Sequence, residues 1–511
     1  MGNVNLSDVC RENARRYPEG LAAVDGDVRY SWPQFDDRVD QVAGMLAAHG
    51  VSQGDRVLWL AQSSVRFLEL MLACARIGAM ICPANWRQSA DEIGFVIDDF
   101  DPAVIVWQDQ EIGAAVAAAW QRTSGKATWI QHDTAEPGGY EDVVSQCKAA
   151  PPAVDVDVDT ALLVIYTAAI VDRPAGSMLS HRNLLAMATM TGAVTGVDHH
   201  SVFVNSGPLF HIGNFQFDSL PVFVRGGTNV YLRRVEEQQL LQLIADEKVT
   251  SAFLMPPTIL KMKELNASLG LDISSLRAGP FGPLWGDALA PDDSPWARHT
   301  GGFGQTEVTG LCVLNAYGGK GIGNSGRPTT LCQVRIVDPD GQEVPPGVAG
   351  EIVVRGDTVH LGYWNRPERN AGRMRGGWWH TTDLGRLEPD GTLEFLGTMT
   401  RMIKSAAENV YPPEVERCLI THPAVERAAV IGVPDARFTQ SVKAVVVLKA
   451  GQQVTADGLI EHCRARIASY KKPKFVEFID ELPLINGVTD YDMLDEKFGG
   501  GGYPGGSNVA T

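Results

Sequence analysis

Apolar residues in the first two thirds of the chain follow two alternating spacings. Over residues 35–49 and 64–78 they recur every three or four positions, which predicts helices with one apolar face. Uninterrupted apolar runs over 55–60 and 103–107 predict buried strands between such helices. Strands that alternate with helices form parallel sheets covered by helices, so we predict an α/β fold.

The pattern changes after residue 330. Short apolar segments separated by Gly, Pro and Asp predict a β-rich subdomain over 331–397, with strands at 333–337, 350–355 and 393–396. We therefore assign residues 1–398 to one large N-terminal domain. A small α+β lid domain is predicted over 399–498, with helices at 413–422 and 456–470 and strands at 428–433 and 441–449. The Gly-rich tail, 499–511, is predicted to be mobile.

Composition narrows the class of protein. A chain of 511 residues with 44% hydrophobic content can bury more than one core. A formal net charge of −17 without a basic stripe argues against nucleic-acid partners. The eight cysteines form no CxxC pair, and no basic, apolar leader opens the chain, so we expect a cytoplasmic protein. The longest apolar run, 161–171, is shorter than the ~20 residues that span a bilayer, so no membrane association is expected.

Seven short segments carry the candidate chemistry. The first reads Tyr-Thr-Ala-Ala-Ile-Val-Asp-Arg-Pro-Ala-Gly over 166–176 and precedes Leu-Ser-His-Arg-Asn-Leu at 179–184. Pro-Ala-Asn-Trp-Arg occupies 83–87, Pro-Leu-Phe-His-Ile-Gly occupies 208–213, and Phe-Gly-Gln-Thr-Glu occupies 303–307. Thr-Thr-Asp-Leu-Gly follows at 381–385, and Lys-Ser-Ala-Ala-Glu-Asn-Val-Tyr-Pro-Pro-Glu-Val-Glu at 404–416.

In this order and spacing the segments resemble the adenylate-forming (ANL) superfamily, which includes acyl-CoA synthetases, peptide-synthetase adenylation domains and firefly luciferase. The resemblance covers roughly residues 7–483. It implies a large N-terminal domain with a mobile C-terminal lid, and two half-reactions in one site. A carboxylate first attacks ATP to give acyl-AMP and pyrophosphate. The lid then rotates, and the thiol of CoA displaces AMP.

The resemblance also implies roles for individual residues. Asp383 would accept hydrogen bonds from the ribose hydroxyls, Thr306 would donate to the α-phosphate, and Glu307 would suit Mg²⁺ in the first step. His211 would act as a gate that admits the thiol. The expected catalytic residues are His211, Thr306 and Glu307, and the expected nucleotide contacts are Gly282, Phe303, Gly304, Thr306 and Asp383.

Two further subsites are expected by resemblance. The pantetheine arm of CoA would pass the position of Ala407, and Lys471 and Lys472 would either meet CoA phosphates or simply be solvated. The acyl group would occupy a wide apolar slot. Its expected lining residues are Phe210, Phe215, Phe281 and Trp285.

The chain departs from the family where the first half-reaction needs positive charge. The phosphate loop of the family, Tyr-Thr-Ser-Gly-Thr-Thr-Gly-x-Pro-Lys-Gly, holds phosphates through glycine N–H groups, hydroxyls and a lysine. Here those positions hold Ala168, Ala169, Ile170, Val171, Asp172 and Ala175. The lysine of the C-terminal motif is replaced by Thr489, and Lys497 lies eight residues further on. Losing one preorganised donor typically lowers a rate ~10²–10³-fold.

Three other departures are less decisive. Thr398 stands where the family has an arginine that contacts ribose, and Thr400 stands at the hinge. Ala407 replaces a glycine, and its methyl group could narrow the path of pantetheine.

We therefore predict a ligase homologue that has lost adenylation and converts pre-formed acyl-AMP and CoA into acyl-CoA and AMP. A partner ligase would supply the adenylate, ATP and Mg²⁺ would not be used productively, and no protein-bound metal is expected. The double loss resembles the non-adenylating acyl-CoA ligases of platensimycin- and platencin-type diterpenoid biosynthesis, which implies a bulky diterpenoid acyl group. An ordinary two-step acyl-CoA synthetase and an inactive acyl-nucleotide-binding scaffold are the alternatives.

Overall fold

The computed structural model describes most of the chain. The described residues are 4–147, 154–167, 174–254, 256–277, 279, 282–286, 288–319, 324–399, 401–405, 408–485 and 488–503.

A six-stranded sheet forms the first half of the large domain. Its strands run in the order β6-β5-β3-β4-β7-β8, and all neighbours are parallel except β7 and β8. The strands are β3 (Arg56–Leu60), β4 (Met80–Pro83), β5 (Val104–Trp107), β6 (Thr128–Gln131), β7 (Ala161–Thr167) and β8 (Ala175–Ser180). Val57 and Trp59 pack with α2 (Trp32–Ala48) and α3 (Val65–Ile77) on one face, while Leu58 and Leu60 pack with α4 (Ala90–Phe100) on the other. Both faces are therefore covered, as parallel sheets require.

A five-stranded sheet lies on the other side of α3. It has the order β11-β9-β10-β1-β2 and is parallel except for the β1–β2 hairpin. Its strands are β1 (Leu21–Asp25), β2 (Val28–Ser31), β9 (Val202–Asn205), β10 (Thr228–Tyr231) and β11 (Ser251–Ala252). Nearly every residue of α3 is buried, since the helix contacts both sheets. The remaining helices of this region are α5 (Gly113–Trp120), α6 (Tyr140–Ser145), α7 (His181–Thr195), α8 (Ile212–Asn214), α9 (Leu220–Arg225), α10 (Glu237–Glu247), α11 (Pro256–Leu269), α12 (Gly282–Trp285) and α13 (Pro295–Arg298), with a π-helical turn, η1, at Phe215–Ser219.

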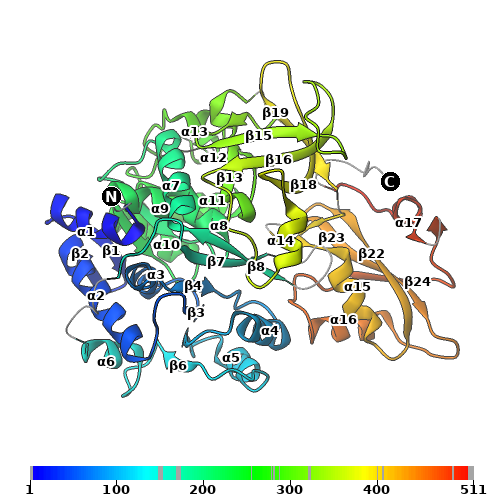
Figure 1. The fold of residues 1–511 in the computed structure, drawn as a ribbon, viewed down its shortest axis with the longest axis horizontal. Helices are drawn as coiled ribbons and strands as arrows, with labels where there is room; N and C mark the ends of the chain where they lie inside the picture. Colours follow the sequence, from blue (N-terminus) through cyan, green and yellow to red (C-terminus); the bar gives the residue numbers. More distant parts are fainter. Residues whose placement is uncertain are drawn as a thin grey trace.

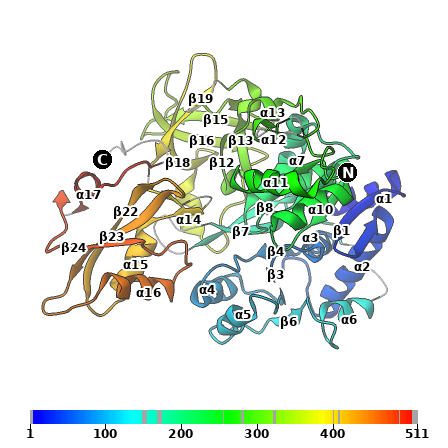
Figure 2. The same cartoon turned by 180° about the vertical axis from the view of Figure 1, so that it is seen from behind.

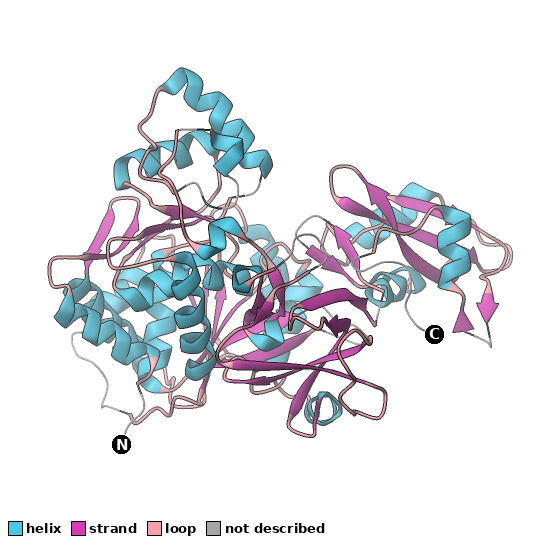
Figure 3. Cartoon of the chain, turned by 90° about the horizontal axis from the view of Figure 1, so that it is seen from above, coloured by secondary structure: helices cyan, strands magenta, loops and turns pink. Residues whose placement is uncertain are grey.

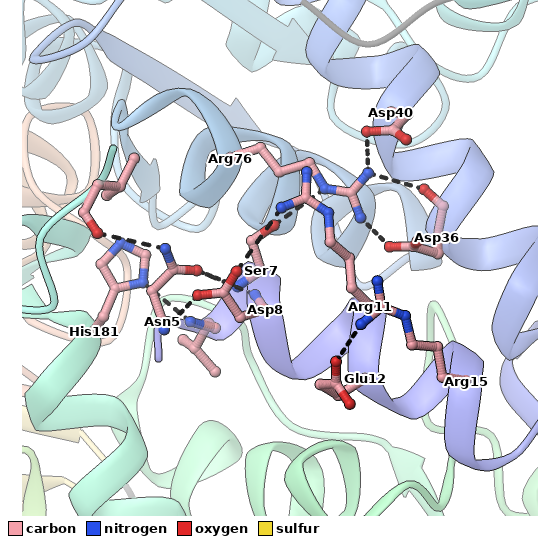
Figure 4. A network of polar contacts seen from close by, with 12 residues as sticks. Asn5, Ser7, Asp8, Arg11, Glu12, Arg15, Asp36, Asp40, Arg76 and His181 are labelled. Atoms are coloured by element: carbon pink, nitrogen blue, oxygen red, sulfur yellow. Dashed lines mark hydrogen bonds and ion pairs between the residues drawn. The ribbon is translucent and has the colours of Figure 1, made fainter. Parts of the chain in front are cut away.

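Helix α1 (Leu6–Arg16) is fastened to the large domain by a polar network (Figure 4). The buried guanidinium of Arg76 in α3 forms ion pairs with Asp36 and Asp40 of α2 and donates to Ser7 of α1 at 3.1 Å. His181 accepts from the backbone N–H of Leu6 at 3.4 Å. His181, which belongs to one of the segments singled out in the sequence, therefore has a structural role and holds the start of α1 in place.

The β-rich subdomain follows, and Figure 1 shows its yellow-green strands beside the sheets of the large domain. The strands β15 (Cys332–Val337), β16 (Gly350–Gly356), β17 (Met374–Arg375), β18 (Trp378–Leu387) and β19 (Leu393–Thr398) form one antiparallel sheet. A three-stranded sheet, β12 (Gly302–Gln305), β13 (Gly310–Leu314) and β14 (Arg327–Pro328), connects it to the large domain, with short 3-10 turns at Thr306–Val308 and Asn315–Tyr317. Helix α14 (Pro367–Arg373) precedes β17.

The lid forms one end of the molecule, coloured orange to red in Figure 1, and Figure 2 shows the same separation from behind. Its sheet has the order β21-β20-β23-β22, with β24 beside β23. The elements are β20 (Ile403–Ser405), β21 (Glu408–Val410), α15 (Pro412–Ile420), β22 (Val425–Asp435), β23 (Thr439–Leu448), α16 (Ala456–Arg464), β24 (Phe475–Phe478), β25 (Leu484–Ile485), β26 (Val488–Thr489) and α17 (Tyr491–Phe498). The predicted boundary at 398/399 falls between β19 and β20.

Two expectations about the lid need correction. The helix predicted over 456–470 ends at Arg464, because the chain turns there to bury Ile467 and Ala468 separately. The described part of the tail, 499–503, packs onto the lid, where the Tyr503 hydroxyl accepts from the N–H of Gly432 at 2.9 Å and donates to Asp495 at 2.9 Å. The rest of the tail, 504–511, lies outside the described residues.

Candidate functional site

A cavity of about 660 Å³ lies where the large domain, the β-rich subdomain and the lid meet. Pro83 and Thr167, at the carboxyl ends of β4 and β7, contribute to its wall, as does the segment that follows β9. Ligands of parallel α/β sheets bind at the carboxyl ends of the strands. Figure 3 shows the lid, near the C-terminus, at one side of the larger body of the molecule.

Asp383 lies on β18 and lines the cavity. Burial raises the pKa of its carboxyl group to about 7, and a hydrogen bond from Gln305 Nε2, at 3.0 Å, opposes that rise. Gln305 is in turn held by the indole N–H of Trp379, which donates to its Oε1 at 3.1 Å. The carboxylate keeps acceptor capacity toward the cavity, as the expected ribose contact requires.

Backbone strain is stored next to Asp383. Thr382 has φ +60°, a left-handed conformation that β-branched residues rarely adopt. Its N–H donates to Glu351 at 3.0 Å, so the strained backbone is held from the neighbouring strand. Such strain clusters at functional sites.

The segment Phe303–Glu307 lines the cavity as expected. Its glycine is also required by the packing of the hairpin. A methyl group on Gly304 would lie 1.9 Å from the carbonyl oxygen of Gly310, where β12 and β13 approach closely. Gly304 also lines the cavity, so the hairpin requirement adds to the expected nucleotide contact and does not replace it. Phe303 lines the cavity and packs against Phe395 at 5.7 Å between ring centroids.

Glu307 is 7% exposed and lines the cavity together with Tyr363. Its Oε1 accepts from the Tyr363 hydroxyl at 2.8 Å and from the Thr167 hydroxyl at 3.2 Å. One carboxylate oxygen is thus committed to the protein. Within the described ranges, no group of three or more His, Cys, Asp or Glu side chains is arranged to hold a metal ion. A cation here would need phosphate oxygens as further ligands.

His211 and Phe210 also line the cavity, as does Lys404 of the lid. The enclosing walls and the charge of Lys404 lower the pKa of His211, so its ring is neutral near pH 7. Its Nδ1 accepts from the Gly213 N–H at 3.2 Å and caps α8. A neutral, locally anchored ring fits the gate expected by resemblance better than it fits an acid.

The two positions that hold lysines in the family contribute no charge to the cavity. Ala175 is fully buried in the core with Phe303 and Val308. Thr489 lies in the β25–β26 hairpin and is not among the lining residues, whereas Lys404, Glu408 and Asn409 of the hinge-following loop are. The lid therefore presents this loop, and not the C-terminal motif, to the cavity.

The lysine pair expected at CoA phosphates is divided. Lys471 is 1% exposed, and its ammonium donates at 2.6 Å to Glu92 of α4 and at 2.6 Å to Glu414 of α15. It is thus engaged in binding the lid to the large domain. Lys472 is half-buried and donates to the Ser469 carbonyl at 3.0 Å.

The expected acyl-pocket residues are also divided. Phe210 lines the cavity, but Phe215 is 2% exposed and packs in the core against Phe67. Phe217 lines the cavity instead, because the π-helical turn η1 changes which side chains face inward. Gly282 lines neither this cavity nor the one beside it.

A second cavity of about 280 Å³ shares Phe217 and Leu311 with the first. Trp285, Phe253 and Trp296 form aromatic walls, and Phe217 lies 5.1 Å from Trp296 between ring centroids. Trp285 therefore lines the neighbouring cavity and not the main one, where it was expected. Five expectations rest on residues outside the described ranges: the phosphate-loop positions 168–172, Phe281, Thr400, Ala407 and the tail beyond residue 503.

Tyr363, Arg369 and Arg373 are among the lining residues that sequence reasoning missed. The two arginines lie four positions apart, so they share one face of α14. The four-residue spacing of these arginines, shortly before the expected ribose motif, was the signal in the sequence from which the pair could have been predicted.

Fold, cavity and segments together define an acyl-CoA ligase-like member of the adenylate-forming superfamily. The family model for AMP-binding enzymes matches residues 10–364, and the model for the AMP-binding enzyme C-terminal domain matches 414–486. The chain belongs to this family.

Individual relatives agree along nearly the whole length. The chain is 33% identical over 491 residues to a feruloyl-CoA synthase of Amycolatopsis sp, covering 94% of this chain and 96% of the relative. It is 31% identical over 469 residues to an indoleacetate–CoA ligase of Aromatoleum aromaticum, covering 89% and 90%. The amide bond synthetase McbA from Marinactinospora thermotolerans has the same fold, with a TM-score of 0.79, 23% identity and coverage of 97% and 100%. In the described part of the chain, no helix is long and apolar enough to cross a membrane.

Proposed function

We propose that this protein catalyses only the second half of the ligase reaction, in which CoA and a pre-formed acyl-AMP give acyl-CoA and AMP. The observation that carries the proposal is the distribution of groups around the cavity. Asp383 remains available to the ribose and the hinge-following loop faces the cavity, while Ala175 and Thr489 bring no cation to a departing pyrophosphate.

The lid orientation supports the same half-reaction. Glu408 contacts Arg87 of the large domain at 3.5 Å, and Ser89 donates to the Arg466 carbonyl at 2.8 Å. With the buried Lys471 contact, these bonds hold the hinge-following loop over the site. A thiol that enters beside this loop would pass His211 before it reaches the acyl carbon.

The chemistry needs little from the protein beyond position and charge. Asp383 would orient the ribose, and Thr306 would donate to the phosphate. A neutral His211 would leave the path of the thiol open. A partner adenylating ligase would supply the acyl-AMP.

The acyl group is proposed to be bulky and apolar. The main cavity and its neighbour offer about 660 Å³ and about 280 Å³, and the boundary between them includes Phe217. Aromatic walls favour a large rigid acid over a short one. A polycyclic diterpenoid acid is our specific candidate, from resemblance.

The test compares two sets of reactants with the purified protein. One contains CoA and synthetic feruloyl-, indoleacetyl-, palmitoyl- or diterpenoid-AMP, and the other contains CoA, MgATP and the corresponding free acids. We expect acyl-CoA from at least one adenylate and none from the free acids. Comparable rates from a free acid and its adenylate would refute the loss of adenylation.

A complete two-step synthetase is the second candidate, and the names of the relatives favour it. Feruloyl-CoA synthase and indoleacetate–CoA ligase are similar to this chain end to end. In the structure, the observation on its side is the arginine pair of α14, which could replace the missing lysines. Acid-dependent exchange of pyrophosphate into ATP would support this candidate, and an absence of product from both reactant sets would support an inactive binding protein.

A further inference from the structure

The cavity contains two cations that the family resemblance does not assign. Among the described lining residues, the positively charged side chains are Arg369, Arg373, Lys404 and Lys471. Lys471 is neutralised by two carboxylates, and Lys404 donates to Asn409 of the lid at 2.7 Å. Arg369 and Arg373 belong to α14, outside the lid.

Arg369 lies at the end of the cavity where the phosphate loop begins. Its guanidinium carbon is 4.3 Å from the centre of the Tyr363 ring. The Tyr363 hydroxyl donates to Glu307, and Glu307 accepts from Thr167, the last described residue before the loop. The stack fixes the plane of the guanidinium and leaves its N–H groups directed to other partners.

Arg373 lies on the ribose side. One of its terminal nitrogens donates to the carbonyl of His380 at 3.1 Å, three residues before Asp383. No ion pair joins Arg369 or Arg373 to a carboxylate within the described residues. Both side chains are half-buried. A guanidinium has five donors, so most of those on this pair remain for an anionic ligand.

We propose that Arg369 and Arg373 bind the phosphate of the nucleotide, both in acyl-AMP and in the AMP that leaves. This inference rests on the proposed function, because it assigns the pair to a mononucleotide. A planar guanidinium pairs with phosphate oxygens through two parallel hydrogen bonds. The pair would thus supply positive charge at the phosphate that stays with the nucleoside, and not at a departing pyrophosphate.

The pair would favour the transition state over the bound adenylate. The CoA thiol first loses its proton to solvent, and its sulfur then forms a bond to the acyl carbon. The bond from that carbon to the phosphate oxygen breaks, and its electron pair stays on AMP. The phosphate charge changes from −1 to −2, so fixed cations stabilise the leaving group more than the reactant.

The experiment measures equilibrium binding of AMP, adenosine and ATP by calorimetry, without turnover. The variants are Arg369→Met, Arg373→Met and the double variant. Arg355→Met is the matched control, since Arg355 is exposed on β16 and does not line the cavity. We expect each single change to weaken AMP about tenfold and the double change at least about thirtyfold, in line with charged hydrogen bonds.

Adenosine affinity should stay within about twofold in all variants, which also shows that they fold. Unchanged AMP affinity in the double variant would overturn the inference. So would weakened binding of ATP alone, because that places the pair at the pyrophosphate. A protein that fails to use acyl-AMP but loses AMP affinity in the double variant would refute the proposed function and retain this site.

Discussion

Replacing Lys471 with Met tests whether one buried ammonium holds the lid against the large domain. The substitution keeps the length of the side chain and removes its charge. Lys472→Met is a matched control, because the neighbouring lysine is only half-buried and donates to Ser469 within its own turn.

The expected loss of docking free energy follows from the two carboxylates that lose their partner when Lys471 is replaced. Lys471 is the common partner of Glu92 and Glu414, whose side chains are only 11% and 9% exposed. Removing one member of a buried ion pair costs about 3–5 kcal/mol, because the remaining charge is uncompensated. Glu92→Gln removes the charge from the contact between domains and also alters the carboxylate that accepts from Ser89 at the start of α4, and we expect about 1.5–3 kcal/mol for it. Since 1.4 kcal/mol is a factor of ten, the docked lid should become at least tenfold less populated relative to the undocked lid.

Limited proteolysis between β19 and β20 provides the assay, because undocking exposes this connection. Lys471→Met and Glu92→Gln should be cut there at least about tenfold faster than Lys472→Met. Equal cutting rates for all three proteins would refute the reasoning.

The contact should also be insensitive to pH in the working range. Burial alone would lower the pKa of Lys471, but Glu414 and Glu92 raise it above its ordinary value. A group whose pKa is raised in the folded state contributes stability below its unfolded pKa and loses it only as pH rises through the folded value. Proteolysis of the unmodified protein should therefore not accelerate between pH 6 and pH 9.

Four further outcomes are expected. Adenosine should bind about tenfold more tightly at pH 8 than at pH 6, because Asp383 must ionise with a pKa of about 7 to accept the ribose hydroxyls, and Asp383→Asn should remove this dependence in titrations. The same raised pKa means that the Asp383 contribution to stability is lost as pH rises from about 4 to about 7, and Asp383→Asn should flatten that part of a urea-denaturation series. Thr382→Gly should stabilise the protein to urea by about 0.5–2 kcal/mol by relieving the left-handed backbone, and a destabilised variant would contradict the strain. Gly304→Ala should lower the melting temperature by several degrees through its clash with Gly310, whereas an unchanged value would show that the hairpin can open.

The sequence predicted most elements because their ends carry local signals. Helix α3 was bounded correctly by Ser64, which caps its first turn, and by Gly78, which ends it in the left-handed conformation. The helix over 456–470 was overextended because Ile467 and Ala468 continue the apolar spacing after the backbone has turned. Periodicity alone does not detect such a turn.

The sequence predicted which segments line the site, but not which of their side chains face the cavity. Asp383, Phe303 and His211 reached the cavity as expected. Phe215 was expected to line the cavity, and Phe217, which was not predicted, lines it instead, since a π-helical turn shifts the register by a step that no residue type signals. Arg369 and Arg373 escaped notice because an arginine pair on a short helix resembles ordinary solvated surface until the fold encloses it.

Gln440 joins the C-terminal tail to the strand of the lid that lines the cavity. Its fully buried amide accepts from the backbone N–H of Lys404 at 2.8 Å and donates to the carbonyl of Gly501 at 2.7 Å. A deletion that starts at residue 499 would therefore loosen the strand that carries Lys404 to the cavity. A purification tag fused to this protein should be placed after Tyr503, behind a spacer, so that the hydrogen bond between Gln440 and Gly501 is kept.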